Sequence, residues 1–287
     1  MVLTSQRFMA AGPFVNVWSF VADGRWNLNI KVLDVAVGRA DRFQQFSRGY
    51  DLATSHIPTF ELEPAPKVIT FDCYGTLVRW HEVLLGEIEA VLERHDANGA
   101  SAPRILESFS AQGRRLTIEK PHRLYKNILR IGFTAAFAEH GVTPSADEIE
   151  LVASSPMTMG PHPDVPDALR RLRSLYKLAI FTNSDDDLIA PTVARIGVPF
   201  DYVITAEQAG AYKPSRQLFE YAYQFMGVKP AETVHVAMGM YWDMKARHEL
   251  DLRGIWVNRR GEKGNADWKP YAEVSDLSGA AELLLPS

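Results

Sequence analysis

The chain has little cysteine, little excess charge of one sign and no long apolar run. Its 287 residues include one cysteine, Cys73, which excludes an internal disulfide and a cysteine-rich metal site. The formal net charge of −4 gives no support to binding of nucleic acid or acidic membranes, which need a clustered positive field. No uninterrupted run of about 18 apolar residues predicts a membrane helix. The lone thiol favours a reducing, cytoplasmic location.

The first 66 residues differ in pattern from the rest of the chain. Aromatic residues and arginines are scattered through them, and only residues 27–37 alternate as a strand does. Residues 8–22 are mostly apolar, but polar residues and a proline interrupt them and no clean cleavage site follows, so a secretory signal is not expected. The proline-rich stretch 63–67 predicts a boundary that ends an extension of unknown role, residues 1–66.

From Lys67 onward, short β-branched and aromatic runs alternate with helical patterns. Strands that are separated by helices of this length predict βαβ units and a parallel sheet, with helices on both faces. The predicted strands are residues 68–74, 177–183, 201–206, 233–238 and 254–258. The predicted helices are residues 164–175, 187–196, 216–226 and 244–250.

One long gap, between Trp80 and about Gly160, interrupts this alternation. It carries helical patterns over residues 83–95, 105–119 and 126–141, without a strong strand signal. A helical insertion of this size after the first strand is large enough to form a cap. The sequence therefore predicts an α/β fold in which a Rossmann-like parallel core, 67–81 and 161–287, carries an α-helical cap, 82–160.

Polar residues follow four of the predicted strands. Because ligands of open parallel sheets bind beyond the carboxyl ends of the strands, we expect these residues to converge. Asp72 can act as a nucleophile if a cation lowers the pKa of its carboxyl group, or it can simply cap the turn at Gly75. The residues in question are Asp72 to Thr76, Thr182 with Asn183, Lys213, and Asp243.

Two of these residues have ordinary structural alternatives. Lys213 is either a solvated loop lysine or the cation that holds Asp72 ionised. Asp243 has the apolar neighbours Met240 and Trp242, and it either positions water there or only ties its loop to the sheet through an ion pair.

Other reactive side chains favour structural roles. The three acids Asp185 to Asp187 complement a helix dipole and cap free amides better than they indicate a metal. His235 lies within an apolar strand and is expected to be a hydrogen-bonded core residue. Strand alternation turns Cys73 to the face opposite Asp72, so a thiol nucleophile is not expected.

The segment FDCYGTL, residues 71–77, resembles the first motif of the haloacid dehalogenase superfamily, an aspartate followed by a Gly-Thr turn. Three further segments resemble the remaining motifs in order, and the tail GIWVNRRG is also similar. The resemblance covers roughly residues 67–287 and implies that the helical insertion is the family's cap. These further motifs are FTNSDDDL at 181–188, AGAYKPS at 209–215 and HVAMGMYWD at 235–243.

Within this superfamily, Tyr74 makes the sequence similar to the type II 2-haloacid dehalogenases. The phosphatases carry a second aspartate at this position and an acid near Met238, both of which serve magnesium. Here Met238 and Met240 supply thioethers, which Mg²⁺ does not prefer. The resemblance thus implies a hydrolase of carbon–halide bonds that acts on small 2-haloacids without metal or cofactor.

The resemblance also implies roles for the catalytic residues. Asp72 attacks the carbon that bears the halogen, and Asp243 activates water that hydrolyses the resulting ester. Lys213 holds Asp72 as a carboxylate, and Thr76 hydrogen-bonds it. Asn183 completes this predicted catalytic set.

A second set of residues is implied to bind the substrate. Thr182 and Asn183 position its carboxylate or the halide, and the backbone amides of Cys73 and Tyr74 form a small anion nest. A cap arginine receives the halide. Arg114 and Arg115 are the candidates because they lie in the middle of the cap, and Trp242 encloses the site.

Three positions depart from the dehalogenase pattern. Met238 and Met240 stand where a serine and an asparagine are usual, and Phe219 stands where a tyrosine is usual. Two other functions stay open, a magnesium-dependent phosphatase of this superfamily and a non-catalytic binding protein with this fold. The expected partner is a small halogenated carboxylate, and a homodimer is compatible with the resemblance.

Overall fold

The computed structural model describes residues 7–11, 14–20, 26–32, 62–97, 99–269 and 271–286. The chain divides into two compact units, Met1–Ile57 and Pro58–Ser287. The first unit holds an antiparallel sheet of β1 (Arg7–Ala11), β2 (Phe14–Phe20) and β3 (Trp26–Val32), in that order. The strand expected at 27–37 is β3, and its last residues lie outside the described part. The domain boundary at residue 66 stays a prediction.

The second unit is built on a six-stranded parallel sheet with the order β6-β5-β4-β7-β8-β9. This arrangement confirms the predicted α/β fold class. All five predicted strands are present, and the sixth, β9, was missed because it has three residues. The strands are β4 (Val68–Phe71), β5 (Lys177–Thr182), β6 (Tyr202–Thr205), β7 (Thr233–Ala237), β8 (Gly254–Val257) and β9 (Ala272–Val274).

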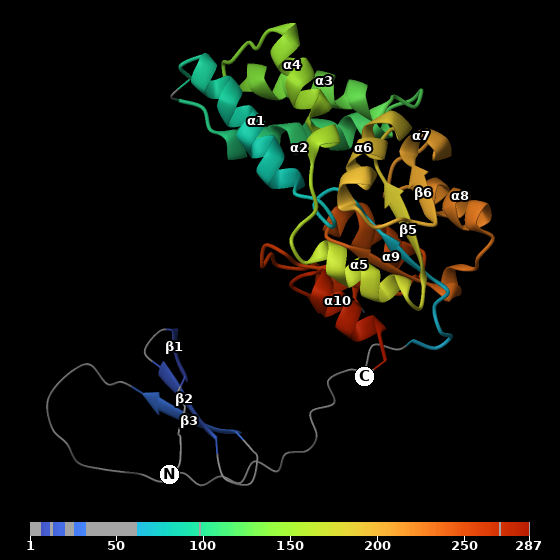
Figure 1. The fold of residues 1–287 in the computed structure, drawn as a ribbon. Coiled ribbons are helices and arrows are strands. Elements are labelled where there is room, and N and C mark those ends of the chain that lie inside the picture. The colour runs from blue at the N-terminus through green and yellow to red at the C-terminus, as the bar shows by residue number, and fades with distance from the viewer. Residues whose placement is uncertain are drawn as a thin grey trace, which may run out of the picture. The chain divides into compact units, whose positions relative to one another are not determined.

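Helices cover both faces of this sheet (Figure 1). Because side chains alternate along a strand, Ile69 and Phe71 of β4 pack with α5, α6 and α10, whereas Val68 packs with α7, α8 and α9. The helices are α5 (Val165–Arg173), α6 (Asp186–Ile196), α7 (Ala206–Ala209), α8 (Arg216–Met226), α9 (Lys245–Glu249) and α10 (Leu277–Leu284). Short helical turns lie at Ser155–Thr158, Pro230–Glu232, Met240–Met244 (η3) and Ala266–Trp268.

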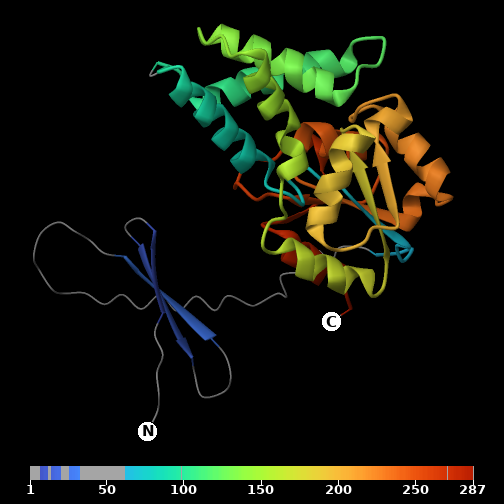
Figure 2. The same ribbon diagram turned by 45° about the horizontal axis from the view of Figure 1, so that its top comes forward.

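Four further helices form a group of their own between β4 and α5, separate from the sheet in both views (Figures 1 and 2). They are α1 (Trp80–Arg94), α2 (Ala102–Ile118), α3 (Tyr125–Glu139) and α4 (Ala146–Ser154). The sequence reasoning missed α4, although Ser145 and Glu148 form a capping box at its start. We call this group the helical cap. None of the helices in the described part of the chain is both long and apolar enough to span a membrane.

Candidate active site

The carboxyl ends of three neighbouring strands bring the predicted polar residues together. β4 lies between β5 and β7, so Asp72, just after β4, has the ends of both strands beside it. The chain runs from β4 toward β6 on one side and then crosses to β7 on the other. The site therefore lies at the topological switch point, where ligands of open α/β sheets bind.

Lys213 lies between two carboxylates. Its Nζ donates a hydrogen bond to Asp72 Oδ1 at 2.8 Å and another to Asp243 Oδ1 at 2.6 Å. Lys213 is 0% exposed, Asp243 1% and Asp72 8%. Charges buried this deeply are stable only when they are paired, so the three groups form one electrostatic unit. We call Asp72, Lys213 and Asp243 the charge cluster.

The turn after Asp72 holds the other carboxylate oxygen. Thr76 Oγ1 donates to Asp72 Oδ2 at 2.7 Å and accepts from the backbone N–H of Met238 at 2.8 Å. Gly75 has a φ of +85° and lies so close to Met238 that a Cβ would be 2.8 Å from its Cε atom. The positive φ favours glycine here, whereas the methionine tip could shift to relieve the contact. Both oxygens of Asp72 are thereby fixed in place.

Asn183 holds the backbone of Lys213. Its Nδ2 donates to the Lys213 carbonyl at 3.1 Å, and the Lys213 N–H donates to its Oδ1 at 2.7 Å. The structure thus places this amide as a support for the lysine loop rather than as a group turned toward a substrate. The neighbouring Thr182 differs, since its buried Oγ1 has no hydrogen-bond partner among the described residues.

The electrostatics of the charge cluster distinguish its two acids. Burial raises the pKa of Asp72, and the charge of Asp243 adds to this effect while Lys213 opposes it. Burial also acts to raise the pKa of Asp243, but Lys213 and a hydrogen bond from His235 outweigh it and lower that pKa. Burial acts to lower the pKa of Lys213, yet the two carboxylates raise it. Asp243 is therefore the more firmly ionised acid.

Asp243 reaches the cluster from a π-helical turn, η3. The N–H of Met244 donates to the carbonyl of Gly239 at 3.1 Å, a bond that spans five residues, and the Asp243 N–H donates to the same carbonyl at 2.8 Å. A Cβ on Gly239 would be 2.3 Å from Asp243 Oδ2, so only glycine leaves room for this carboxylate. Single π-turns of this kind are frequent at functional sites.

Arg259 is a supporting residue that the sequence reasoning missed. Its guanidinium donates two hydrogen bonds to the Thr76 carbonyl, at 3.1 and 2.9 Å, and two to the Asp164 carboxylate, at 3.0 and 2.9 Å. It thereby ties the turn after Asp72 to the start of α5. The signals in the sequence are its place just after a strand end and within the segment GIWVNRRG.

The helical cap is fastened to the core by Asp185. This carboxylate accepts hydrogen bonds from the backbone N–H groups of Tyr125 and Lys126 at 2.7 and 2.9 Å. It therefore caps α3, a helix of the cap, instead of the helix that follows it in sequence. The ring of Tyr125 stacks on Tyr74 with 6.5 Å between centroids, which places the cap beside the residues that follow Asp72.

The two candidate cap arginines have different surroundings. The Arg114 guanidinium lies 6.0 Å from the ring centroid of Tyr241, on the turn that carries Asp243. The Arg115 side chain is 61% exposed and bonds Glu119 and Gln112 of its own helix. Trp242 is half-buried and packs edge-to-face on Tyr241 at 4.9 Å. Arg114 thus lies near the turn that carries Asp243, although it is exposed like Arg115, and Trp242 is the sequence neighbour of Asp243 on that turn.

The Cys73 side chain is fully buried in the core cluster that packs on α5, α6 and α10. Burial raises the pKa of its thiol well above the usual range, and the charge of Asp72 adds to this. A buried neutral thiol is a poor nucleophile. Only the backbone of this residue is available to the site.

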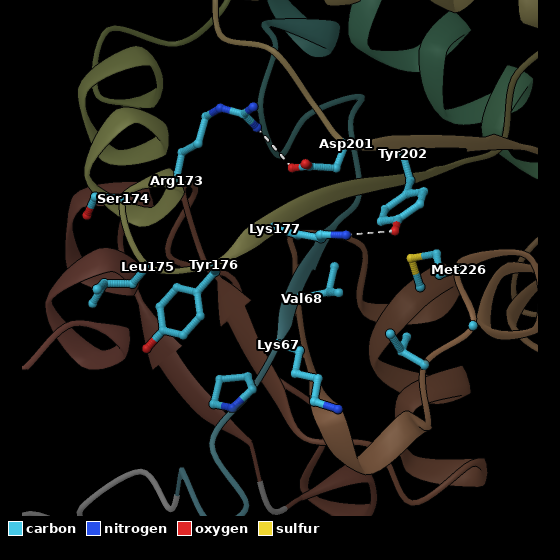
Figure 3. A pocket seen from close by; sticks show the side chains of 13 residues that line it. Lys67, Val68, Arg173, Ser174, Leu175, Tyr176, Lys177, Asp201, Tyr202 and Met226 are labelled. Atoms are coloured by element: carbon cyan, nitrogen blue, oxygen red, sulfur yellow. Dashed lines mark hydrogen bonds and ion pairs between the residues drawn. The ribbon is translucent and has the colours of Figure 1, made fainter.

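A surface pocket of about 770 Å³ lies at the opposite edge of the sheet (Figure 3). Lys67, Lys177 and Tyr202 line it, and these residues lie at or next to the amino ends of β4, β5 and β6. The charge cluster lies beyond the carboxyl ends of the same strands. This pocket is therefore not the catalytic site.

Comparison with known proteins agrees with this architecture. Residues 66–246 match the family model of the haloacid dehalogenase-like hydrolases. The chain is 26% identical to (S)-2-haloacid dehalogenase H-109 of Pseudomonas putida, over 76% of this chain and 97% of that protein. A glyceraldehyde 3-phosphate phosphatase of Methanocaldococcus jannaschii is 33% identical, but over 32% of this chain and 42% of its own length.

The fold matches solved structures as well. The L-2-haloacid dehalogenase from Xanthobacter autotrophicus, solved with chloropropionic acid covalently bound, superposes with a TM-score of 0.66 at 18% identity. The match covers 76% of this chain and 98% of that one. The family model thus assigns the chain to a class of hydrolases, and the solved structure agrees with it in fold. The chain belongs to the haloacid dehalogenase-like hydrolase family.

Proposed function

We propose that the protein removes halide from small 2-haloacids by hydrolysis, through an ester on Asp72. The observation that carries this proposal is the buried Lys213 ammonium, which is hydrogen-bonded to both Asp72 and Asp243. One acid is thereby held in place as a nucleophile, and the other stays ionised as a base beside it. The relatives that match the chain over most of its length are named 2-haloacid dehalogenases.

In the first step, a carboxylate oxygen of Asp72 attacks the carbon that bears the halogen. A carbon–oxygen bond forms, the carbon–halogen bond breaks, and the halide leaves with the bonding electrons. In the second step, water attacks the ester carbonyl carbon of Asp72 while Asp243 takes one proton of that water. The bond between this carbon and the substrate oxygen then breaks, the substrate oxygen takes the proton from Asp243, and the remaining proton of the water is released to solvent from Asp72. The products are a 2-hydroxy acid of inverted configuration, halide, a proton and the regenerated Asp72 carboxylate.

Three groups support binding of an anionic substrate. The buried Thr182 hydroxyl, which lacks a partner among the described residues, can donate to the substrate carboxylate. The backbone amides of Cys73 and Tyr74 follow the nucleophile directly, where a small anion nest can form. Arg114 of the cap lies near the turn that carries Asp243 and is the proposed halide acceptor.

Trapping of the ester tests this function. We expect wild-type protein to release halide from 2-chloropropanoate without added metal, and Asp243→Asn to retain a mass increase of one propanoate on Asp72. Asp201→Asn, which changes an acid beside the distant pocket, is the matched control and should form no lasting adduct. A folded protein that releases no halide from a panel of haloacids would overturn the proposal.

The donor set does not fit a magnesium-dependent phosphatase. Mg²⁺ prefers an octahedral shell of hard oxygens, and the cluster supplies two carboxylates that an ammonium already bridges. Tyr74 and Met238 occupy the nearby positions, and neither offers a carboxylate. Release of phosphate from phosphate esters only in the presence of Mg²⁺ would favour the phosphatase instead.

The proposed partner is the small halogenated carboxylate alone. The absence of nucleic-acid binding, the homodimer and the cytoplasmic location stay predictions from the sequence. Light scattering of the purified chain decides the oligomeric state directly.

A further inference from the structure

A buried histidine lies directly behind the charge cluster, and the reaction proposed above does not use it. His235 lies in the middle of β7, and the parallel register pairs it with Thr70 of β4. Both residues are fully buried. A polar pair at the centre of a sheet needs partners for its polar atoms, so its contacts are informative.

Each nitrogen of the imidazole has one polar partner. Nδ1 lies 2.8 Å from Thr70 Oγ1, and Nε2 lies 3.0 Å from Asp243 Oδ1. Phe181 and Phe219 pack on the ring, with centroids at 5.9 and 5.6 Å. Apolar packing thus fixes the ring plane, and the two hydrogen bonds fix its rotation within that plane.

The chemistry of the partners assigns the hydrogens. An ionised carboxylate only accepts hydrogen bonds, so Nε2 must carry a hydrogen that it donates to Asp243. In the neutral ring Nδ1 is then an acceptor. The Thr70 hydroxyl donates to it at 2.8 Å, a much shorter contact than the 3.4 Å one between the same hydroxyl and the Val234 carbonyl. Thr70 thereby selects the tautomer that can bind Asp243.

The contacts of Asp243 are divided unequally between its two oxygens. Oδ1 accepts from both Lys213 Nζ and His235 Nε2. No hydrogen bond from the described residues reaches Oδ2, which lies against Gly239. The carboxylate is therefore anchored through one oxygen, and the other retains its lone pairs for an external donor.

We propose that His235, supported by Thr70, is the positioning residue that aims Asp243 Oδ2 at the water that hydrolyses the Asp72 ester. This inference rests on the proposed function and refines its second step. While the ester exists, the Asp72 carbonyl no longer carries a full charge and attracts Lys213 less. His235 then keeps Asp243 from following the lysine, because it holds Oδ1 from its fixed place on β7.

The same geometry predicts which half of the reaction depends on His235. Among the described residues, the side chains that hydrogen-bond the carboxylate of Asp72 are Lys213 and Thr76, whereas His235 hydrogen-bonds Thr70 and Asp243. Formation of the ester should therefore be independent of His235, whereas hydrolysis should depend on it. A residue that served only core packing would affect both steps together.

The experiment compares the two rates in single-turnover reactions with 2-chloropropanoate, followed by rapid quenching and intact mass. His235→Leu removes both hydrogen bonds, and His235→Gln retains an amide N–H that can replace Nε2–H. Phe219→Leu is the matched control, because it loosens the packing on the ring without removing a polar contact. Thr70→Val removes only the hydroxyl and serves if His235→Leu fails to fold.

We expect His235→Leu to slow ester hydrolysis by roughly 10- to 100-fold, because Asp243 loses one of the two hydrogen bonds that hold Oδ1. Ester formation should change by less than about 3-fold, and ester should accumulate on Asp72. His235→Gln should recover most of the hydrolysis rate, Thr70→Val should fall between these variants, and Phe219→Leu should leave the ratio of the two rates unchanged.

Equal slowing of both steps, or no change in either, overturns the role of His235 and leaves the proposed function intact. Absence of an ester in the wild type with every haloacid overturns the proposed function and this role together. Nitrogen NMR of the protein with labelled histidine tests the hydrogen bonds of His235 without substrate. We expect the Nε2–H tautomer of His235 in the wild type, and we expect its nitrogen signals to shift in Asp243→Asn. The Nδ1–H tautomer would contradict the assignment.

Discussion

The two edges of the central sheet carry similar residue types in different surroundings. At the carboxyl edge, Lys213 joins Asp72 and Asp243 with side-chain exposures of 0%, 11% and 1%. At the amino edge, Lys67 pairs with Glu232 at exposures of 67% and 23%, and Arg173 pairs with Asp201 at 37% and 26%. The pocket of Figure 3 lies at this second edge.

The difference between the edges is one of solvation. Water screens the pairs at the amino edge, and exposed pairs of this kind contribute about 0–1 kcal/mol. At the carboxyl edge, water is excluded, so each charge strongly changes the protonation and orientation of the next. Nucleophilic catalysis needs such a fixed, poorly solvated carboxylate, and only one edge provides it.

The largest loss of activity is expected from replacement of the nucleophile at the carboxyl edge. Asp72→Asn keeps the size of the side chain but removes the attacking charge, so we expect halide release to fall by on the order of 10⁴-fold or more. Halide-electrode assays with thermal unfolding as a check on folding measure this. Activity within about tenfold of wild type would show that Asp72 is not the nucleophile.

Removal of the central cation should affect both folding and activity. Lys213→Met leaves two buried carboxylates facing each other, and breaking a buried pair in this way costs about 3–5 kcal/mol of the free energy of unfolding. Urea denaturation at neutral pH measures the loss. Because the like charges repel, we also expect stability to recover in Lys213→Met combined with Asp243→Asn. No recovery in the double variant would contradict a shared electrostatic unit.

The dependence of activity on pH gives a smaller and more specific effect. Asp72 must be ionised to attack, and its pKa is raised by burial and by Asp243. Halide release should therefore fall, as the pH is lowered, at a midpoint above the ordinary aspartate value of about 3.9. Initial rates of ester formation in Asp243→Asn should show a midpoint at lower pH, because the repelling charge is gone. An unchanged midpoint would show that the charge of Asp243 does not raise the pKa of Asp72.

The smallest effect is expected at the amino edge. Arg173→Gln removes an exposed ion pair with Asp201, so the free energy of unfolding should change by about 1 kcal/mol or less. Halide release should stay within about twofold of wild type, since the pocket is not at the carboxyl edge. Steady-state kinetics and urea denaturation test both statements. A large loss of halide release would show that this pocket contributes to activity, contrary to the prediction.

The strands of the core could be predicted because their residues are nearly continuous apolar runs with turn residues at each end. β9 and α4 were missed for different reasons. β9 has three residues and no period. The start of α4 is marked by a capping box, Ser145 at the N-cap and Glu148 in the first turn, which the hydrophobic pattern alone does not reveal.

The location of the site could be predicted because the carboxyl ends of parallel strands lie at one edge of the sheet. That rule placed Asp72, Lys213 and Asp243 in one region, but it could not assign their hydrogen bonds. Asn183 holds the backbone of Lys213, and Asp185 caps α3 of the cap. Both contacts join segments far apart in the chain, and no local pattern encodes them.

The sequence by itself determined the parallel α/β core, the helical insertion and the identity of the acids and the lysine at the strand ends. These features depend on local periodicity and on the fixed polarity of parallel strands. Only the tertiary structure decided that Lys213 bridges both acids, that Arg114 and not Arg115 lies over the ring of Tyr241, and that Thr70 lies beside His235. The register between strands and the packing of the cap set these contacts, and both depend on the whole fold.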